Sequence, residues 1–70
     1  MSYRIIYVKD VEFGSLARDF PASNDEDARE KARGEIGRLK LQHGNDILVR
    51  HLQRIEPLSD MEEKVIEISF

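Results

Sequence analysis

The residues of this chain that are best suited to bind a partner are a group of positive side chains near its middle. Residues 29–54 contain seven Lys or Arg and three Asp or Glu, a net +4, whereas the whole chain carries −3. Such a concentration of bases suits an anionic partner, either nucleic acid or an acidic protein, if the bases converge in space. The candidate partner-binding bases are Arg33, Arg38, Lys40, Arg50 and Arg54.

Two tyrosines extend this candidate surface. Tyr3 and Tyr7 are four residues apart in a segment that predicts a strand, so their side chains share one face. Exposed there, both rings could stack on nucleic-acid bases. In the alternative interpretation both rings belong to the hydrophobic core, with their hydroxyls at its rim. The acidic total and the lack of an aromatic RNA-binding motif favour the core.

Residues for catalysis or metal binding are scarce. The chain has no cysteine, and its two histidines, His43 and His51, are eight residues apart. A thiolate zinc site and a disulfide are therefore excluded, and the histidines lack the spacing of paired metal ligands. The four glycines fit neither a phosphate-binding loop nor a dinucleotide fingerprint. We expect no catalytic residues, no metal, no cofactor and no small-molecule substrate, and hence no enzyme.

The elements that must position these side chains begin with a hairpin. Residues 3–8 are rich in β-branched and aromatic side chains and predict a strand with apolar groups on both faces, as a central strand has. Residues 15–22 alternate and predict a second strand. Residues 10–14 predict the connection, with Gly14 at positive φ.

A helix is predicted next. Residues 23–26 (SNDE) match a capping box, which predicts Ser23 as the N-cap, and Gly44 is a natural end. Gly34 and Gly37 lie inside the helix and indicate either close approach to a neighbour or a tolerated surface position. The apolar stripe consists of Ala28, Ala32, Ile36 and Leu39.

Residues 47–56 (ILVRHLQRIE) allow two interpretations. Their apolar spacing favours a second helix, which would make the chain ββααβ. A strand with one bulge also explains it, placing Ile47 and Val49 on one side of the bulge and Leu52 on the other. We adopt the strand because it gives the first strand a second neighbour. Residues 64–70 alternate and predict the last strand.

Together these elements predict an α+β fold in a single domain of residues 1–70. Chain direction gives an antiparallel four-stranded sheet of order 2-1-3-4 with one helix on one face, a ββαββ two-layer sandwich. This pattern resembles many short bacterial and phage proteins, a resemblance of architecture that implies no activity. Because one helix cannot cover both faces of four strands, the other face is expected to be open.

An open sheet face in so small a domain favours binding to another protein. We expect a cytoplasmic, non-enzymatic interaction module, regulator or inhibitor that forms a homodimer or binds another protein, using the open face or an edge strand. No apolar run is long enough for a membrane span. An inhibitor could offer its acidic segments, 10–27 and 56–67, to a basic partner. Weak nucleic-acid binding through residues 29–54 is the alternative function.

Overall fold

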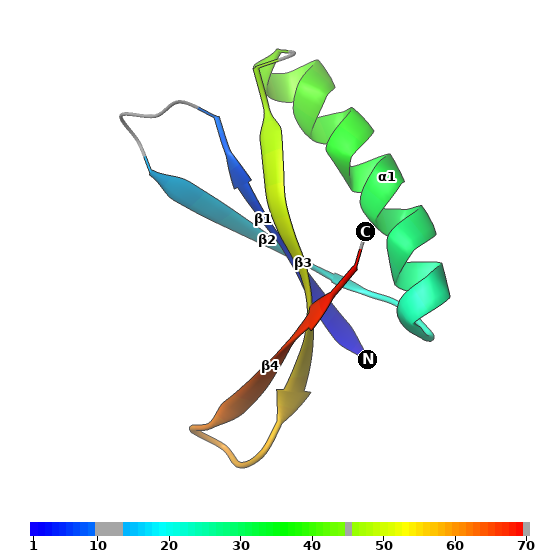
Figure 1. Cartoon of the computed structure of the whole chain (residues 1–70), viewed down its shortest axis with the longest axis vertical. Coiled ribbons are helices and arrows are strands. Elements are labelled where there is room, and N and C mark those ends of the chain that lie inside the picture. The colour runs from blue at the N-terminus through cyan, green and yellow to red at the C-terminus, as the bar shows by residue number, and fades with distance from the viewer. Residues whose placement is uncertain (10–13, 45, 70) are drawn as a thin grey trace.

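The computed structural model describes residues 1–9, 14–44 and 46–69, which form two hairpins joined by a helix (Figure 1). The sheet has the order β2-β1-β3-β4, and all neighbouring strands are antiparallel. The predicted α+β fold, its ββαββ element order and its strand order are confirmed. The elements are β1 (Ser2–Val8), β2 (Ser15–Pro21), α1 (Asp25–His43), β3 (Leu48–Pro57) and β4 (Glu63–Ile68).

The strand interpretation of residues 47–56 is confirmed, and the helical alternative is wrong. Against β1, Val49 pairs with Tyr7 and His51 pairs with Ile6, so Arg50 is the extra residue of a β-bulge. The bulge resets the alternation of side chains along β3. The apolar residues of β3 therefore do not alternate strictly with polar ones, although the segment is a strand.

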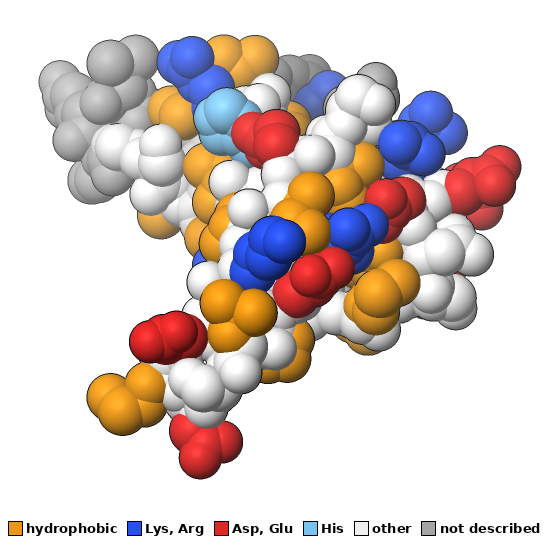
Figure 2. All heavy atoms as spheres, turned by 60° about the horizontal axis from the view of Figure 1, so that its bottom comes forward, with side chains coloured by type: hydrophobic (Ala, Val, Ile, Leu, Met, Phe, Trp, Pro, Cys, Tyr) orange, Lys and Arg blue, Asp and Glu red, His pale blue; other side chains and the backbone are white. Residues whose placement is uncertain are grey.

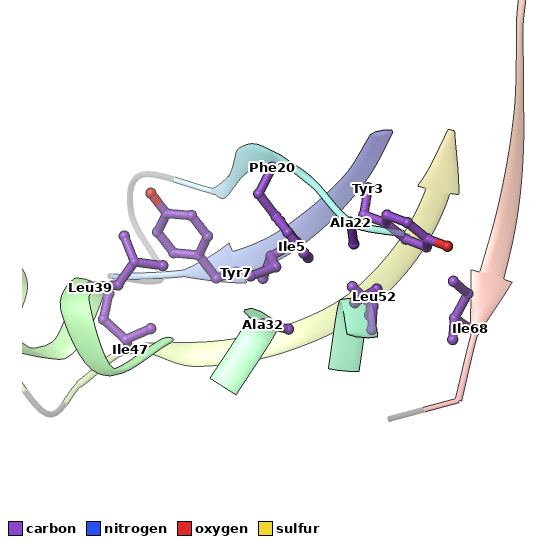
Figure 3. Close-up of a cluster of buried hydrophobic side chains, with 11 residues drawn as sticks. Tyr3, Ile5, Tyr7, Phe20, Ala22, Ala32, Leu39, Ile47, Leu52 and Ile68 are labelled. Carbon is purple, nitrogen blue, oxygen red and sulfur yellow. The ribbon is translucent and has the colours of Figure 1, made fainter. Parts of the chain in front are cut away.

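The core lies between α1 and one face of the sheet (Figure 3). Every second residue of β1 points into it, and the rings of Tyr3 and Phe20 stack with their centroids 6.0 Å apart. Near the C-terminal end of α1, Leu39 lies beside Tyr7 and Ile47. The helix contributes mainly small side chains to the core, which lets its backbone approach the sheet. Its buried residues are Ala28, Ala32 and Leu39.

The start of α1 differs by one residue from the prediction. Asn24 is the N-cap, and its side-chain oxygen accepts a hydrogen bond from the Asp27 N–H at 2.8 Å. Asp27 in turn accepts from the backbone N–H of Ser23 at 2.9 Å. The prediction of Ser23 as N-cap is wrong because Asp27 takes the role expected for Glu26, which moves the capping pair along by one position.

We expect Asn24→Ala to lower the free energy of unfolding by about 1 kcal/mol, because the first turn of α1 loses the acceptor for one of its free N–H groups. Ser23→Ala is the matched control and should have a smaller effect, since alanine keeps the backbone N–H that Asp27 accepts. Urea unfolding followed by circular dichroism measures both variants. A larger loss at Ser23 than at Asn24 would contradict this assignment of the cap.

The glycines divide into two groups. Gly14 and Gly44 have φ values of 69° and 89°, in the region that favours glycine, and the N–H of Gly44 bonds to the Lys40 carbonyl at 2.8 Å to end α1. The positive φ predicted for Gly14 is confirmed, and the rest of that predicted turn, residues 10–13, lies outside the described residues. A Cβ at Gly34 or Gly37 would meet open space, so both are surface positions.

Candidate functional site

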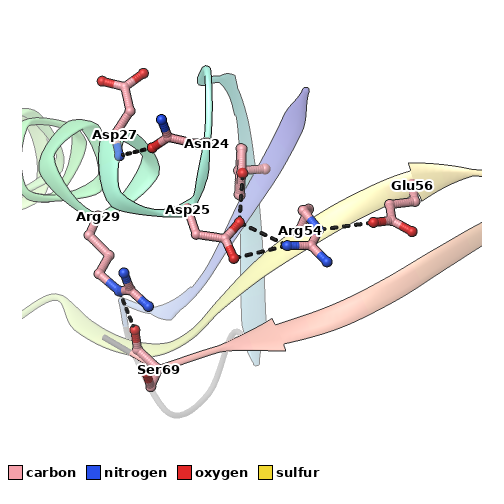
Figure 4. A network of polar contacts seen from close by, with 8 residues as sticks. Asn24, Asp25, Asp27, Arg29, Arg54, Glu56 and Ser69 are labelled. Carbon is pink, nitrogen blue, oxygen red and sulfur yellow. Dashed lines mark hydrogen bonds and ion pairs between the residues drawn. The ribbon is translucent and has the colours of Figure 1, made fainter.

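The predicted basic residues do not form a continuous patch, and Arg54 shows why (Figure 4). Its Nη1 lies 2.9 Å from both carboxylate oxygens of Asp25, and its Nε donates to Glu56 at 3.0 Å. The guanidinium is partly buried between α1 and β3. The charge of Arg54 is therefore balanced inside the fold and holds the helix start against the sheet.

Tyr3 and Tyr7 belong to the core, with side chains that are 0% and 7% exposed. The core interpretation is confirmed, and neither ring is placed to stack on a nucleic-acid base. The Tyr3 hydroxyl instead donates to Asp25 at 2.8 Å. Asp25 thus joins β1, α1 and β3, through partners that lie 22 and 29 residues away in the chain. No local pattern in the sequence indicates this network.

The network lowers the pKa of Asp25 and raises the pKa of Tyr3. The hydrogen bond from Tyr3, and then that from Arg54, lowers the pKa of Asp25, because both favour the carboxylate. Burial, and then the bond to Asp25, raises the pKa of the Tyr3 hydroxyl. Asp25 is consequently held as an anion and Tyr3 as a neutral donor, a combination that suits a structural contact.

The remaining four predicted bases lie on the surface in different settings. Arg38 is exposed and forms an ion pair with Glu35 at 3.1 Å. Glu35 also forms an ion pair with Arg18 at 2.7 Å. Arg33 and Lys40 are exposed on one flank of α1, seven residues or about two turns apart. Arg50 is exposed at the bulge of β3. Arg33, Lys40 and Arg50 thus remain as candidates for contact with a partner.

The side of the sheet opposite α1 is a second candidate surface, which we call the far face. Residues directly opposite one another in neighbouring strands share a face, so the register identifies its members. Leu48 and Val65 are its most exposed large apolar side chains, at 55% and 48%, and Ile55 is buried beside Val65. The apolar residues of the far face are Ile6, Val8, Ala17, Leu48, Ile55 and Val65.

Several polar and charged residues of the far face contact one another. Arg4 donates two hydrogen bonds to Asp19, at 2.7 and 3.1 Å, and this contact lowers the pKa of Asp19. His51 lies against Glu67 across the β3–β4 hairpin. In the view of Figure 2, which is turned so that the bottom of Figure 1 comes forward, blue basic and red acidic side chains also lie next to each other. The far face therefore combines exposed apolar groups with a few charged side chains, of which Arg4 and Asp19 balance each other.

Comparisons with known proteins add nothing to this geometry: no family model, curated protein or solved structure matches the chain. Within residues 1–9, 14–44 and 46–69, no group of three or more His, Asp or Glu side chains could hold a metal ion. In the same residues, no helix has both the length and the apolar character needed to cross a membrane. The surfaces of the molecule are therefore the guide to its function.

Proposed function

We propose that this chain is a small cytoplasmic, non-enzymatic protein-interaction module that pairs with a second copy of itself through the far face. The observation that carries the proposal is the exposure of Leu48 and Val65 on a sheet face that α1 does not cover. Burying these side chains against a second sheet would remove apolar surface from water, which is the main favourable term in protein association.

The electrostatics of the far face suit a second copy. Because Arg4 is paired with Asp19 within its own copy, these two charges would stay balanced when two such faces meet, and Glu67 would keep its contact with His51. Two antiparallel sheets pack face to face at a spacing of about 10 Å, with their side chains interdigitated.

The size of the molecule allows such an interface. A standard interface buries about 800 Å² per partner. This is roughly one sixth of the 4959 Å² surface of the described chain. The far face extends over all four strands and can supply an area of this order.

We expect size-exclusion chromatography with light scattering to find a dimer at high micromolar concentration. Leu48→Lys and Val65→Lys should each weaken the dimer at least about tenfold, because each places a charge in the interface. Leu41→Lys is the matched control, since Leu41 is 88% exposed on α1 and away from the far face. A wild-type chain that remains monomeric, or equal weakening by Leu41→Lys, would overturn the proposal.

We do not propose nucleic-acid binding through residues 29–54. Tyr3 and Tyr7 are buried, and Arg54 is bound to Asp25 and Glu56. The inhibitor variant likewise gains no support from the acidic helix start. Asp25 holds Tyr3 and Arg54, and Asp27 completes the helix cap and pairs with Lys31, so these carboxylates have partners within the fold.

A further inference from the structure

β3 is longer than β4, its outer neighbour, so the first part of β3 pairs with β1 alone. β4 pairs with residues 52–57 of β3, whereas β1 pairs with β3 from Leu48 to Ile55. In the described part of the chain, residues 48–51 therefore have β1 on one side and no strand on the other. We call this segment the open edge. A strand directs backbone N–H and C=O groups to both sides, so the outer groups of the open edge have no strand partner among the described residues.

Ser69, the residue that follows β4, makes a specific contact with α1. The carbonyl of Ser69 accepts a hydrogen bond of 2.7 Å from Nε of Arg29 on α1. In Figure 1 the end of β4 accordingly diverges from β3 and points toward the helix. Among the described residues, the β3–β4 ladder ends at the pair Leu52–Ile68, and the segment of β3 before this pair has no partner strand on that side.

A groove of about 330 Å³ lies where the ladder ends. Val49, Leu52 and Ile68 give it an apolar floor, since Leu52 and Ile68 are buried and Val49 is half-buried. Its rim is polar and includes Arg50. The volume is at the small end of the range for binding pockets, and suits one or two side chains of an extended segment rather than a large ligand. The groove is lined by Val49, Arg50, His51, Leu52, Glu67 and Ile68.

The charges around the open edge are mainly positive. Arg50 projects from the bulge within the edge itself and is exposed. Arg33 and Lys40 follow Arg29 along one flank of α1, at four and eleven residues beyond it. Because Arg29 reaches the end of β4, this flank is turned toward the β4 side of the sheet. Two carboxylates are also near: Glu67 at the groove, which contacts His51, and Asp46, which is exposed two residues before the open edge in the chain.

We propose that the open edge binds an acidic, extended peptide segment of a partner protein. The segment would lie beside residues 48–51 and hydrogen-bond to the open edge as an added strand. Its carboxylates would face Arg33, Lys40 and Arg50, and one apolar side chain would enter the groove. A second copy is the poorer occupant of this site, because pairing two open edges would bring Arg50 of each copy close to the other.

This inference extends the proposed interaction module by naming the chemistry of a partner, but it does not require the dimer. The probe is a fluorescent seven-residue peptide in which glutamate and valine alternate, read by anisotropy. We expect saturable binding that weakens at least tenfold in Arg50→Glu and in the double variant Arg33→Glu/Lys40→Glu. A peptide with proline at its centre should also bind at least tenfold more weakly, because proline lacks the backbone donor.

The control is Lys64→Glu, which makes the same change of charge at the other end of β4, opposite Glu56, and should leave affinity within about twofold of wild type. Absence of saturable binding, equal weakening by Lys64→Glu, or equal binding of the proline peptide would each overturn the inference. Tighter binding of a single-stranded oligonucleotide of equal charge would also overturn it, in favour of nucleic acid. A dimer that binds no acidic peptide would refute this site alone, and a monomer that binds it would refute only the dimer.

Discussion

Leu52→Ala is expected to lower the free energy of unfolding by about 3 kcal/mol, because a buried leucine loses its contacts and leaves a cavity. Leu52 is 1% exposed and lies in the middle of the sheet, paired with Ile5 of β1 and with Ile68 of β4. The surrounding strands are hydrogen-bonded on both sides of it and have little freedom to collapse into the space.

The consequence for this chain is large because of its size. Domains of about 70 residues have only a few kcal/mol of stability in total, so the variant should be partly unfolded at 37 °C. Urea unfolding at 15 °C measures the loss. Leu41→Ala is the matched control, since the same atoms are removed from an exposed position on α1, and its stability should stay within about 0.5 kcal/mol of wild type. A Leu52→Ala variant as stable as Leu41→Ala would contradict the assignment of the core.

Acid is expected to destabilise the protein as the pH falls through about 4, the ordinary range of aspartate. The pKa values of Asp25, Asp19 and Asp27 are all lowered in the folded state, chiefly by hydrogen bonds from Tyr3, from Arg4 and from the Ser23 backbone, respectively. A carboxyl with a lowered folded pKa binds its proton more tightly in the unfolded chain. Its stabilisation is therefore present above the unfolded pKa and is lost as the pH falls through the folded pKa.

Asp25 should account for a measurable part of this dependence. Asp25→Asn removes the carboxylate that holds Tyr3 and Arg54, so we expect a lower midpoint of urea unfolding at pH 7 and a shallower decline between pH 5 and pH 2. Tyr3→Phe keeps the ring in the core and removes only the hydroxyl, and should also make the decline shallower. Asp60→Asn, at an exposed position between β3 and β4, is the control and should follow the wild-type profile. Parallel profiles for wild type and Asp25→Asn would refute the role of the network.

At alkaline pH, Tyr3 gives stability the opposite dependence on pH, so that stability falls as the pH rises. Because the pKa of its hydroxyl is raised in the folded state, the unfolded chain loses this proton first. The stabilisation is complete below about pH 10 and is lost as the pH rises through the folded pKa. Tyr3→Phe should remove this part of the alkaline destabilisation, as measured by unfolding between pH 8 and pH 11.

Regular structure was predictable here because its signals are local. The alternation in β1 and the apolar stripe at Ala28, Ala32 and Leu39 follow directly from the geometry of strands and helices. The cap of α1 was harder to place, since Ser23 and Asn24 are neighbours and both are good N-cap residues. In the structure the side chain of Asn24 accepts from the Asp27 N–H, whereas Ser23 contributes its backbone N–H. The bulge at Arg50 could be anticipated only as one of two ways to explain an irregular spacing.

By itself the sequence determined most of the elements and their order, because these follow from periods of a few residues. It left residues 47–56 open between strand and helix, and it left Tyr3 and Tyr7 open between the core and an exposed face. Only the tertiary structure decided the state of the charged residues. Arg54 lies in the basic segment and Asp25 in the acidic one, yet they neutralise each other across 29 residues. Likewise, Arg29 binds the carbonyl of Ser69, 40 residues away, next to the point where β4 ends. Such contacts depend on how complete elements pack in space, which no short window of sequence contains.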